Sequence, residues 1–167
     1  MAKAVFLDRD GVINSDDGLY YLVDPEDFEI NPGVPELLKW LKTQGFLLIV
    51  ISNQGGISKG LYSKMDVEII HEKMNLQLAK DGLSFDEIYY CPHHPENEKC
   101  ICRKPDTVMI EKAISRFSID VNSSYFIGDR HTDMEAGKKA GLKTIKVESN
   151  QDMSLLIEFF KKELQFN

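Results

Sequence analysis

The sequence predicts an α/β fold, a single doubly wound and mostly parallel sheet of the Rossmann-like kind. Short strand-like segments alternate with segments of helical periodicity along the chain. The segment of residues 46–51 is apolar at every position, as expected for a central parallel strand that is covered on both faces. Acidic, amide and hydroxyl side chains directly follow several strands, and open parallel sheets bind their ligands at these carboxyl ends.

Chain length and composition are those of one ordinary globular domain, which we place over residues 1–167. Of the 167 residues, 43% are apolar and 28% are charged. The formal net charge of -7 argues against a nucleic-acid or membrane partner, so an anionic substrate needs local cations or a metal. The longest apolar run is too short to cross a bilayer, and the first strand leaves no room for a signal peptide. We therefore expect a cytoplasmic monomer.

The first strand, residues 4–7, runs directly into the acidic pair Asp8 and Asp10. Buried like charges repel each other and are costly to desolvate, and a divalent cation resolves that conflict. Mg²⁺ prefers a few carboxylate ligands and leaves positions for water and phosphate oxygens. Asp8 could then attack phosphorus, while Asp10 acts as general acid and base. For the pair taken alone, a solvated strand end is the simpler interpretation, but three later segments reverse that judgement.

A long polar segment and the first helix follow the acids. Residues 14–31 are acidic and interrupted by glycine and proline, so we expect a loop that forms the rim of a substrate site. Packing of Tyr20, Tyr21 and Phe28 should hold this loop down. Helical periodicity then begins after Gly33 and ends at Gly45.

The second strand leads into the turn S-N-Q-G-G at residues 52–56. Its hydroxyl and amides could donate hydrogen bonds to a phosphate. Taken alone, the segment is equally consistent with a plain glycine-rich turn. Ser63 then starts a long amphipathic helix that ends at Gly82, and we expect His71 within it to be a solvent-side or packing residue.

All three cysteines lie just beyond the third strand, which we place at residues 85–90. In a reducing compartment, the C-x-H and C-x-C spacings indicate a four-ligand zinc site rather than a disulfide. The expected ligands are Cys91, His93, Cys100 and Cys102. Four protein ligands fill a tetrahedron, so such a zinc would be structural. His94 is the alternative to its neighbour, and the C-x-H spacing favours His93.

Two cations follow the zinc segment, residues 91–102. Arg103 can grip a phosphate with two hydrogen bonds, and Lys104 can neutralise phosphoryl oxygens as a compact charge. Without the zinc segment beside it, a solvated basic pair would be the simpler interpretation. A helix over residues 107–117 comes next.

The last third of the chain supplies a third acidic position. The fourth strand, residues 125–127, delivers Asp129, which would complete a cation site with the first acidic pair. Asp133 would serve the N-terminus of the next helix or orient neighbouring groups, and we expect His131 to lie in the loop before that helix. We place the last strand at residues 144–147 and a closing amphipathic helix at residues 154–164.

Taken together, these motifs resemble the haloacid dehalogenase superfamily of Mg²⁺-dependent phosphotransferases. The match covers nearly the whole chain: D-x-D at residues 8–10, then Ser52, then Lys104, then G-D-x-x-x-D at residues 128–133. The resemblance implies a sheet domain of the haloacid dehalogenase type, and the chain has no room for a mobile cap domain. It also implies hydrolysis of a small phosphorylated substrate through a phospho-aspartate.

The zinc segment is similar to that of one branch, which contains D,D-heptose 1,7-bisphosphate phosphatases and histidinol-phosphate phosphatases. The segment N-Q-G-G-I-S-K-G at residues 53–60 is closer to the heptose group's N-Q-S-G-I-A-R-G. We therefore expect the 7-phosphate of a heptose bisphosphate as the substrate, in carbohydrate metabolism that serves nucleotide-heptose or lipopolysaccharide synthesis. Histidinol phosphate is the alternative, because the zinc segment is short and Ser52 stands where the heptose group usually has threonine.

The resemblance also implies a role for each matching residue. Asp8 would be the nucleophile and Asp10 the acid/base, while Ser52 and Lys104 would stabilise the transferred phosphoryl group. Mg²⁺ would be held by the Asp8 side chain, the Asp10 backbone carbonyl and Asp129, and Zn²⁺ would be structural. The residues implied to contact the substrate are Asp16, Asp17, Gly18, Leu19, Asn53, Gln54, Arg103 and Arg130.

Two other classes of protein share some of these features. A phospho-receiver signalling domain also places acids, a hydroxyl and a lysine at strand ends. Its phosphorylated aspartate lies on a middle strand, whereas here the acidic pair ends the first strand. A zinc-knuckle binding module would need a basic surface, and the net charge argues against one.

Overall fold

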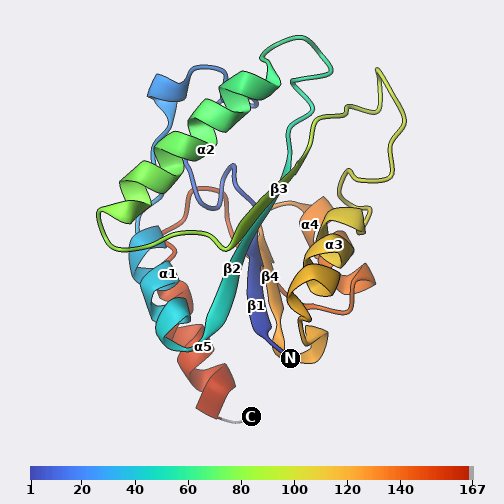
Figure 1. The fold of residues 1–167 in the computed structure, drawn as a ribbon. Coiled ribbons are helices and arrows are strands. Elements are labelled where there is room, and N and C mark those ends of the chain that lie inside the picture. Colours follow the sequence, from blue (N-terminus) through green and yellow to red (C-terminus); the bar gives the residue numbers. More distant parts are fainter. Residues whose placement is uncertain (166–167) are drawn as a thin grey trace.

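Five parallel strands form one sheet in the computed structural model, which describes residues 1–165 (Figure 1). The strands are β1 (Lys3–Leu7), β2 (Phe46–Asn53), β3 (Glu87–Cys91), β4 (Tyr125–Gly128) and β5 (Lys143–Lys146). Their order across the sheet is β3-β2-β1-β4-β5. This is the doubly wound arrangement, and its ligand crevice lies where the winding reverses, between β1 and β4. The predicted fold class is confirmed.

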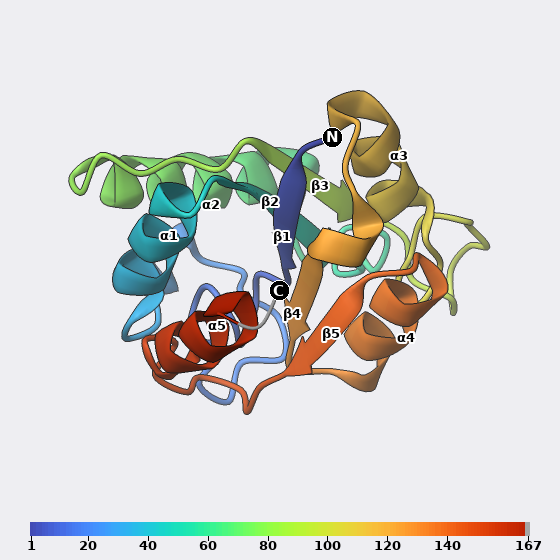
Figure 2. The ribbon, with the colours of Figure 1, turned by 90° about the horizontal axis from the view of Figure 1, so that it is seen from below.

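Helices cover both faces of the sheet. They are α1 (Val34–Thr43), α2 (Lys64–Ala79), α3 (Val108–Phe117), α4 (His131–Lys139) and α5 (Leu155–Gln165). Figure 2 shows α1, α2 and α5 on one side of the sheet and α3 and α4 on the other. Side chains alternate along β1, so that Val5 and Leu7 pack with the first group and Ala4 and Phe6 with the second.

The sequence placed most elements to within a few residues, with three differences. β3 begins at Glu87 rather than at residue 85, although Asp86 already donates its backbone N–H to the oxygen of Leu48 and accepts the Leu48 N–H at its carboxylate. The segment of residues 14–31 contains a short 3₁₀ helix, Pro25–Asp27. α4 begins at His131, which was expected in a loop, and Asp133 lies inside its first turn.

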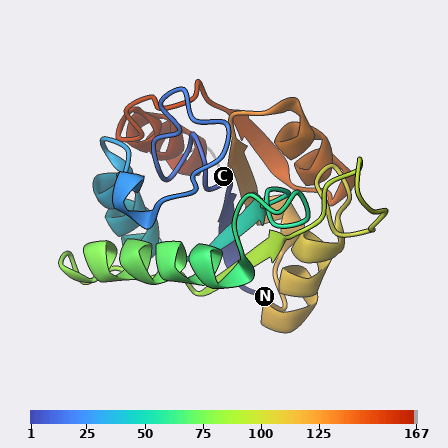
Figure 3. The same cartoon turned by 90° about the horizontal axis from the view of Figure 1, so that it is seen from above.

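The connections that carry the motifs gather at the carboxyl end of the sheet. The segment after β1, the turn after β2 and the zinc segment after β3 all lie at this end (Figures 1 and 3). Residues far apart in the sequence therefore meet above the centre of the sheet. Among the described residues, no helix is both long enough and apolar enough to cross a membrane.

Candidate active site

A cavity of about 290 Å³ opens beside the end of β1. The cavity is lined by six of the residues to which the resemblance gave a catalytic or substrate-binding role: Asp8, Asp10, Asn53, Arg103, Lys104 and Arg130. They come from the ends of β1, β2 and β4 and from the segment that follows the zinc ligands. The fold therefore brings together the acidic pair, the lysine and both arginines, as expected for strand-end motifs of a parallel sheet.

Other residues in the implied set lie behind the cavity wall or outside it. Ser52 and Gln54 are each 1% exposed and do not line the cavity. The segment of residues 16–19 does not line it either. Asp16 instead accepts a hydrogen bond from the Ser149 hydroxyl, and its backbone nitrogen donates to the side chain of Asn150.

Lys104 occupies the centre of the charged groups. Its Nζ lies 2.8 Å from Oδ1 of Asp8 and 2.7 Å from Oδ1 of Asp133, and it donates to the backbone oxygen of Ile51 at 2.7 Å. Burial lowers the pKa of this lysine, but the charges of Asp8 and Asp133 outweigh burial, and the pKa lies above its usual value. A buried ammonium with two carboxylates stays charged.

The Asp8 carboxyl group has a pKa well above its usual value. Burial and the charge of Asp133 raise the pKa of Asp8 to about 7, although Lys104 acts in the opposite direction. A nucleophile has to be ionised, and a cation beside it favours that form. The surroundings of Asp8 are therefore suited to a bound cation.

Three carboxylates are grouped closely enough to hold a metal ion. Ligand oxygens of Asp8, Asp129 and Asp133 all lie within 4.8 Å of one another. Oδ1 of Asp129 is buried and has no hydrogen-bond partner among the described residues, and an unpaired buried oxygen is a natural metal ligand. Burial and the charge of Asp133 raise the pKa of Asp129, which a cation would reverse. The oxygen-only donor set fits Mg²⁺.

Asp133, the second acid of the G-D-x-x-x-D motif, contacts both the N-terminus of α4 and Lys104. Its Oδ2 accepts a hydrogen bond from the backbone nitrogen of Arg130 at 3.0 Å, so it serves the N-terminus of α4, while Oδ1 pairs with Lys104. A Cβ on Gly128 would lie 2.3 Å from the Cβ of Asp133. Only glycine therefore lets β4 approach this aspartate closely. Both roles expected for Asp133 are present.

Asp10 points into a set of hydrogen-bond donors rather than toward Lys104. Its carboxylate accepts hydrogen bonds from Arg9, from Nδ2 of Asn14 at 3.1 Å and from Nε2 of Gln54 at 2.8 Å. Burial would raise the pKa of Asp10, but the charge of Arg9 and these hydrogen bonds hold it below the usual value. The pKa shifts of the two acids are therefore opposite in direction when no metal ion is bound.

Arg9 and His71 form a buried layer behind Asp10. Arg9 is 0% exposed, although its neighbours in the sequence are the two acids Asp8 and Asp10. Its NH2 lies 2.8 Å from Asp10 Oδ1, and its NH1 lies 3.3 Å from Nε2 of His71. Burial and the charge of Arg9 lower the pKa of His71 to about 3, so the imidazole is neutral and accepts from the guanidinium. His71, expected at a solvent-side or packing position, is buried and pairs with Arg9.

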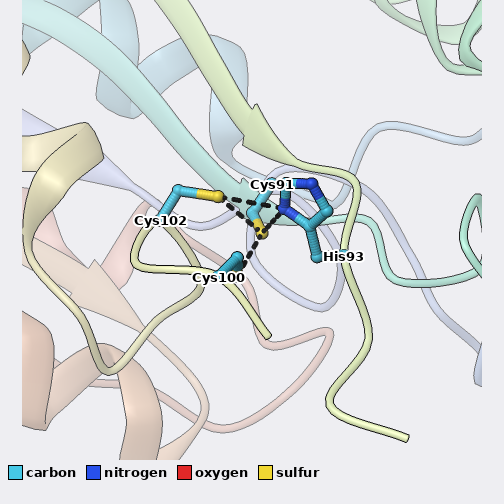
Figure 4. A group of neighbouring side chains, drawn as sticks. All are labelled: Cys91, His93, Cys100 and Cys102. Atoms are coloured by element: carbon cyan, nitrogen blue, oxygen red, sulfur yellow. Dashed lines mark hydrogen bonds between the residues drawn. The ribbon is translucent and has the colours of Figure 1, made fainter. Parts of the chain in front are cut away.

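The cysteine and histidine side chains named in the zinc prediction converge (Figure 4). The Cys91 sulfur lies 3.5 Å from Nδ1 of His93, 3.7 Å from the Cys100 sulfur and 3.1 Å from the Cys102 sulfur. Zinc with bonds of about 2.0–2.3 Å holds its ligand atoms roughly 3.5–3.8 Å apart. The cysteines are free thiols rather than a disulfide, and the cluster could hold zinc.

The zinc segment is tied to the substrate side of the cavity. Arg103 donates to the backbone oxygen of His93 at 2.9 Å, and a Cβ on Gly55 would lie 3.0 Å from its NH1. Asn53 binds both the nitrogen and the oxygen of the Lys104 backbone. The end of β2 therefore holds the Lys104 backbone, and the backbone of His93 holds the Arg103 guanidinium.

Further residues line the cavity that were not among the implied substrate contacts. They are Tyr20, Tyr21, Gly55, Tyr62, His131 and Thr132. The two neighbouring tyrosines were expected only to pack the loop, yet Tyr20 is 66% exposed at the rim, and the Arg130 guanidinium lies over its ring at 5.4 Å. Two adjacent aromatic residues in an otherwise polar loop were the sequence signal that could have indicated this surface.

The fold, with acidic groups where its winding reverses, is that of the haloacid dehalogenase-like hydrolases. A family model described as HAD-hydrolase-like matches residues 101–161. Similar proteins named D-glycero-beta-D-manno-heptose-1,7-bisphosphate 7-phosphatase include one from Haemophilus ducreyi, 43% identical over 85% of this chain and 80% of its own length. Another, from Pasteurella multocida, is 41% identical over 92% and 86%. A protein from Campylobacter jejuni, named for the alpha form, is 42% identical over 86% and 80%.

Solved structures agree with these relatives. A D,D-heptose 1,7-bisphosphate phosphatase from B. bronchiseptica, complexed with magnesium and phosphate, superimposes with a TM-score of 0.85 at 27% identity, over 99% of each chain. The enzyme of the same name from Burkholderia thailandensis has a TM-score of 0.65 at 26% identity, over 93% of this chain and 84% of its own. The chain belongs to the haloacid dehalogenase-like hydrolases and, within them, to the heptose-bisphosphate phosphatase family.

Proposed function

We propose that this protein is a Mg²⁺-dependent phosphatase that removes the 7-phosphate from D-glycero-D-manno-heptose 1,7-bisphosphate. The observation that carries the proposal is the shared name of relatives that are 40–46% identical over most of the chain. The site is consistent with it, because a nucleophile candidate, an acid/base candidate and a buried lysine line one cavity. Relatives are named for both anomers, so both belong in the assay.

In the first step, an oxygen of Asp8 attacks phosphorus, and the bond from phosphorus to the sugar oxygen breaks. Asp10 gives a proton to the departing oxygen, which leaves as the sugar alcohol. Lys104, held 2.8 Å from Asp8, stabilises charge on the transferred phosphoryl group. Ser52, which is 1% exposed behind the cavity wall, would have to turn its hydroxyl hydrogen toward the cavity to donate to the same group.

In the second step, water attacks the phosphorus of phospho-Asp8. Asp10 takes a proton from that water, the bond between Asp8 and phosphorus breaks, and inorganic phosphate leaves. Asp8 and Asp10 thereby return to their starting forms. Mg²⁺ bound by Asp8, Asp129 and the Asp10 carbonyl would supply charge neutralisation for the phosphoryl oxygens.

Recognition of the rest of the substrate falls to the cationic side of the cavity. Arg103 and Arg130 line it together with Asn53, and a guanidinium binds a second phosphate with paired hydrogen bonds. The segment of residues 16–19 would complete the contacts from the rim. Zn²⁺ bound by the cysteine and histidine cluster would be structural and would hold Arg103 in place.

A panel of phosphate esters tests this proposal directly. Phosphate release would be measured with Mg²⁺ for both anomers of heptose 1,7-bisphosphate, for histidinol phosphate and for common sugar monophosphates. We expect kcat/KM for a heptose bisphosphate to exceed the other values by at least about tenfold, with phosphate lost from position 7. A preference for histidinol phosphate would contradict the substrate, and no Mg²⁺-dependent turnover of any ester would contradict the activity.

A further inference from the structure

The amide of Gln54 lies between the groups proposed to carry the chemistry. Its Nε2 donates to Oδ2 of Asp10 and to Oγ of Ser52, each at 2.8 Å. An amide nitrogen carries two hydrogens, so both are in use. Because the side chain is also 1% exposed and outside the cavity lining, it has no free donor to offer a substrate.

Tyr62 fixes the amide from its other side. The tyrosine hydroxyl donates to Oε1 of Gln54 at 2.8 Å. A carboxylate only accepts hydrogen bonds, so Nε2 has to face Asp10, and Oε1 has to face the tyrosine. Burial raises the pKa of Tyr62 to about 12, so the hydroxyl keeps the proton that it donates. The flip of the amide that would release Asp10 is therefore opposed at both ends.

The backbone around these two side chains is built to let them meet. A Cβ on Gly56 would lie 2.3 Å from the Tyr62 ring, so a side chain at this position would displace the tyrosine. The backbone nitrogen of Gln54 donates to the oxygen of Cys91 at 2.7 Å, which anchors the residue to the end of β3. Local packing therefore fixes both members of the pair.

We propose that Gln54 and Tyr62 are positioning residues for the phosphatase reaction, and that Gln54 does not contact the substrate. Gln54 orients the carboxylate of Asp10 and, by donating to Ser52, directs that hydroxyl's own hydrogen toward the phosphoryl group. Tyr62 holds the amide in the one orientation that does both. This inference rests on the proposed function, because it takes Asp10 as the acid/base and Ser52 as a phosphoryl ligand.

The test compares Tyr62→Phe, Gln54→Leu and the double variant on two kinds of ester. Heptose 1,7-bisphosphate has a poor leaving group that needs a proton from Asp10, whereas p-nitrophenyl phosphate has a good one. Tyr89→Phe is the matched control, since it removes a buried tyrosine hydroxyl outside the cavity lining. Far-UV circular dichroism and thermal unfolding would establish that each variant is folded.

For the heptose ester, we expect Tyr62→Phe to lower kcat/KM about 2- to 10-fold, the effect of one net hydrogen bond. Gln54→Leu should lower it on the order of 10²-fold, because a displaced catalytic group loses about that much. The double variant should match Gln54→Leu within about twofold, since the two residues act as one unit. The losses should be several-fold smaller for the aryl ester, whose leaving group needs less protonation by Asp10.

Several outcomes would overturn the proposal. Equal losses for the two esters, full activity of Tyr62→Phe, or a double variant many-fold less active than Gln54→Leu would each do so. If the wild-type protein does not hydrolyse heptose bisphosphate, the proposed function fails first. The same comparison then runs on whichever alkyl phosphate ester the wild-type protein hydrolyses, so the two failures are distinguishable.

Discussion

Single residues at this site depend on neighbours for their charge. Lys104 is 2% exposed and remains charged because Asp8 and Asp133 flank it, and the same lysine moderates the raised pKa of Asp8. Removing Lys104 would leave two buried carboxylates without their cation, which is strongly destabilising, whereas losing the Asp8 charge leaves Lys104 paired with Asp133. The most informative substitutions therefore change chemistry while preserving shape.

Asp8→Asn is such a change, since the amide keeps the shape of the carboxyl group but cannot attack phosphorus. We expect turnover to fall below detection while the far-UV circular dichroism spectrum stays that of the wild type. Steady-state phosphate release with Mg²⁺ measures the first point. Appreciable activity in the purified variant would contradict the covalent mechanism.

Asp10→Asn should lower kcat/KM for the heptose ester by roughly 10²–10⁴-fold, the usual contribution of general acid–base catalysis. The loss should be smaller for an aryl phosphate, whose leaving group needs less protonation. A pair of substrates assayed in parallel measures this difference. Equal losses would show that Asp10 acts in some other way.

His71 should make part of the protein's stability depend on pH. Its pKa falls from 6.5 in the unfolded chain to about 3 in the folded protein, because of burial and the charge of Arg9. Below pH 6.5 the unfolded state therefore binds the proton, and stability is lost as the pH falls toward 3. At pH 5 the loss from this group is about 2 kcal/mol.

His71→Gln removes that titration and keeps a hydrogen-bond acceptor for Arg9. Urea unfolding of both proteins at pH 7 and at pH 5 gives four free energies of unfolding. We expect the wild type to lose about 2 kcal/mol more than the variant over this interval. The raised pKa of Asp8 makes stability rise as the pH falls, which is the opposite direction. Because Asp8 is present in both proteins, its effect cancels in the comparison. An identical loss in the two proteins would disprove the prediction.

At the scale of elements, the segment between β3 and α3 stands out because it has little core of its own. Ile101 is 74% exposed, and ordering each residue costs about 1–2 kcal/mol of backbone entropy. Zinc binding supplies on the order of 10–16 kcal/mol in small peptides, which is enough to order such a segment. The segment ends at Arg103 and Lys104, so its order bears on catalysis.

Removing zinc should therefore abolish activity while the sheet remains folded. Protein treated with a chelator and then returned to Mg²⁺ would be compared with a sample also given Zn²⁺. We expect native helical circular dichroism in both samples and turnover only in the second. Full activity in protein shown by metal analysis to contain no zinc would refute the structural role.

Most elements followed from their patterns, and the exceptions have physical causes. The all-apolar run of β2 predicted a strand, because burial on both faces requires apolar residues at every position. The spacing of apolar residues predicted the helices, because a helix is buried on one face only. The start of β3 was placed two residues early, since Phe85 is apolar like a strand residue whereas the paired residues of β3 start at Glu87.

At the scale of the whole molecule, the spaced motifs predicted which side chains would share a cavity. Parallel strands deliver their carboxyl ends to one edge, so order along the chain was enough for Asp8, Asn53 and Lys104. The buried Arg9 was not predictable, because a charged residue between two acids is normally exposed. Its burial depends on His71 from a distant helix, and a single sequence does not show such pairings.

The tip of the zinc segment offers a site for engineering. Residues 95–99 are exposed, whereas the ligand atoms on either side of them lie within 4.8 Å of one another. With both ends held, doubling the length of such a loop adds only about 0.6 kcal/mol of closure entropy. A peptide tag or a fluorescent reporter inserted here would sit within a few residues of Arg103 without entering the cavity. The same tolerance would let evolution lengthen or shorten this loop while Arg103 and Lys104 stay in place.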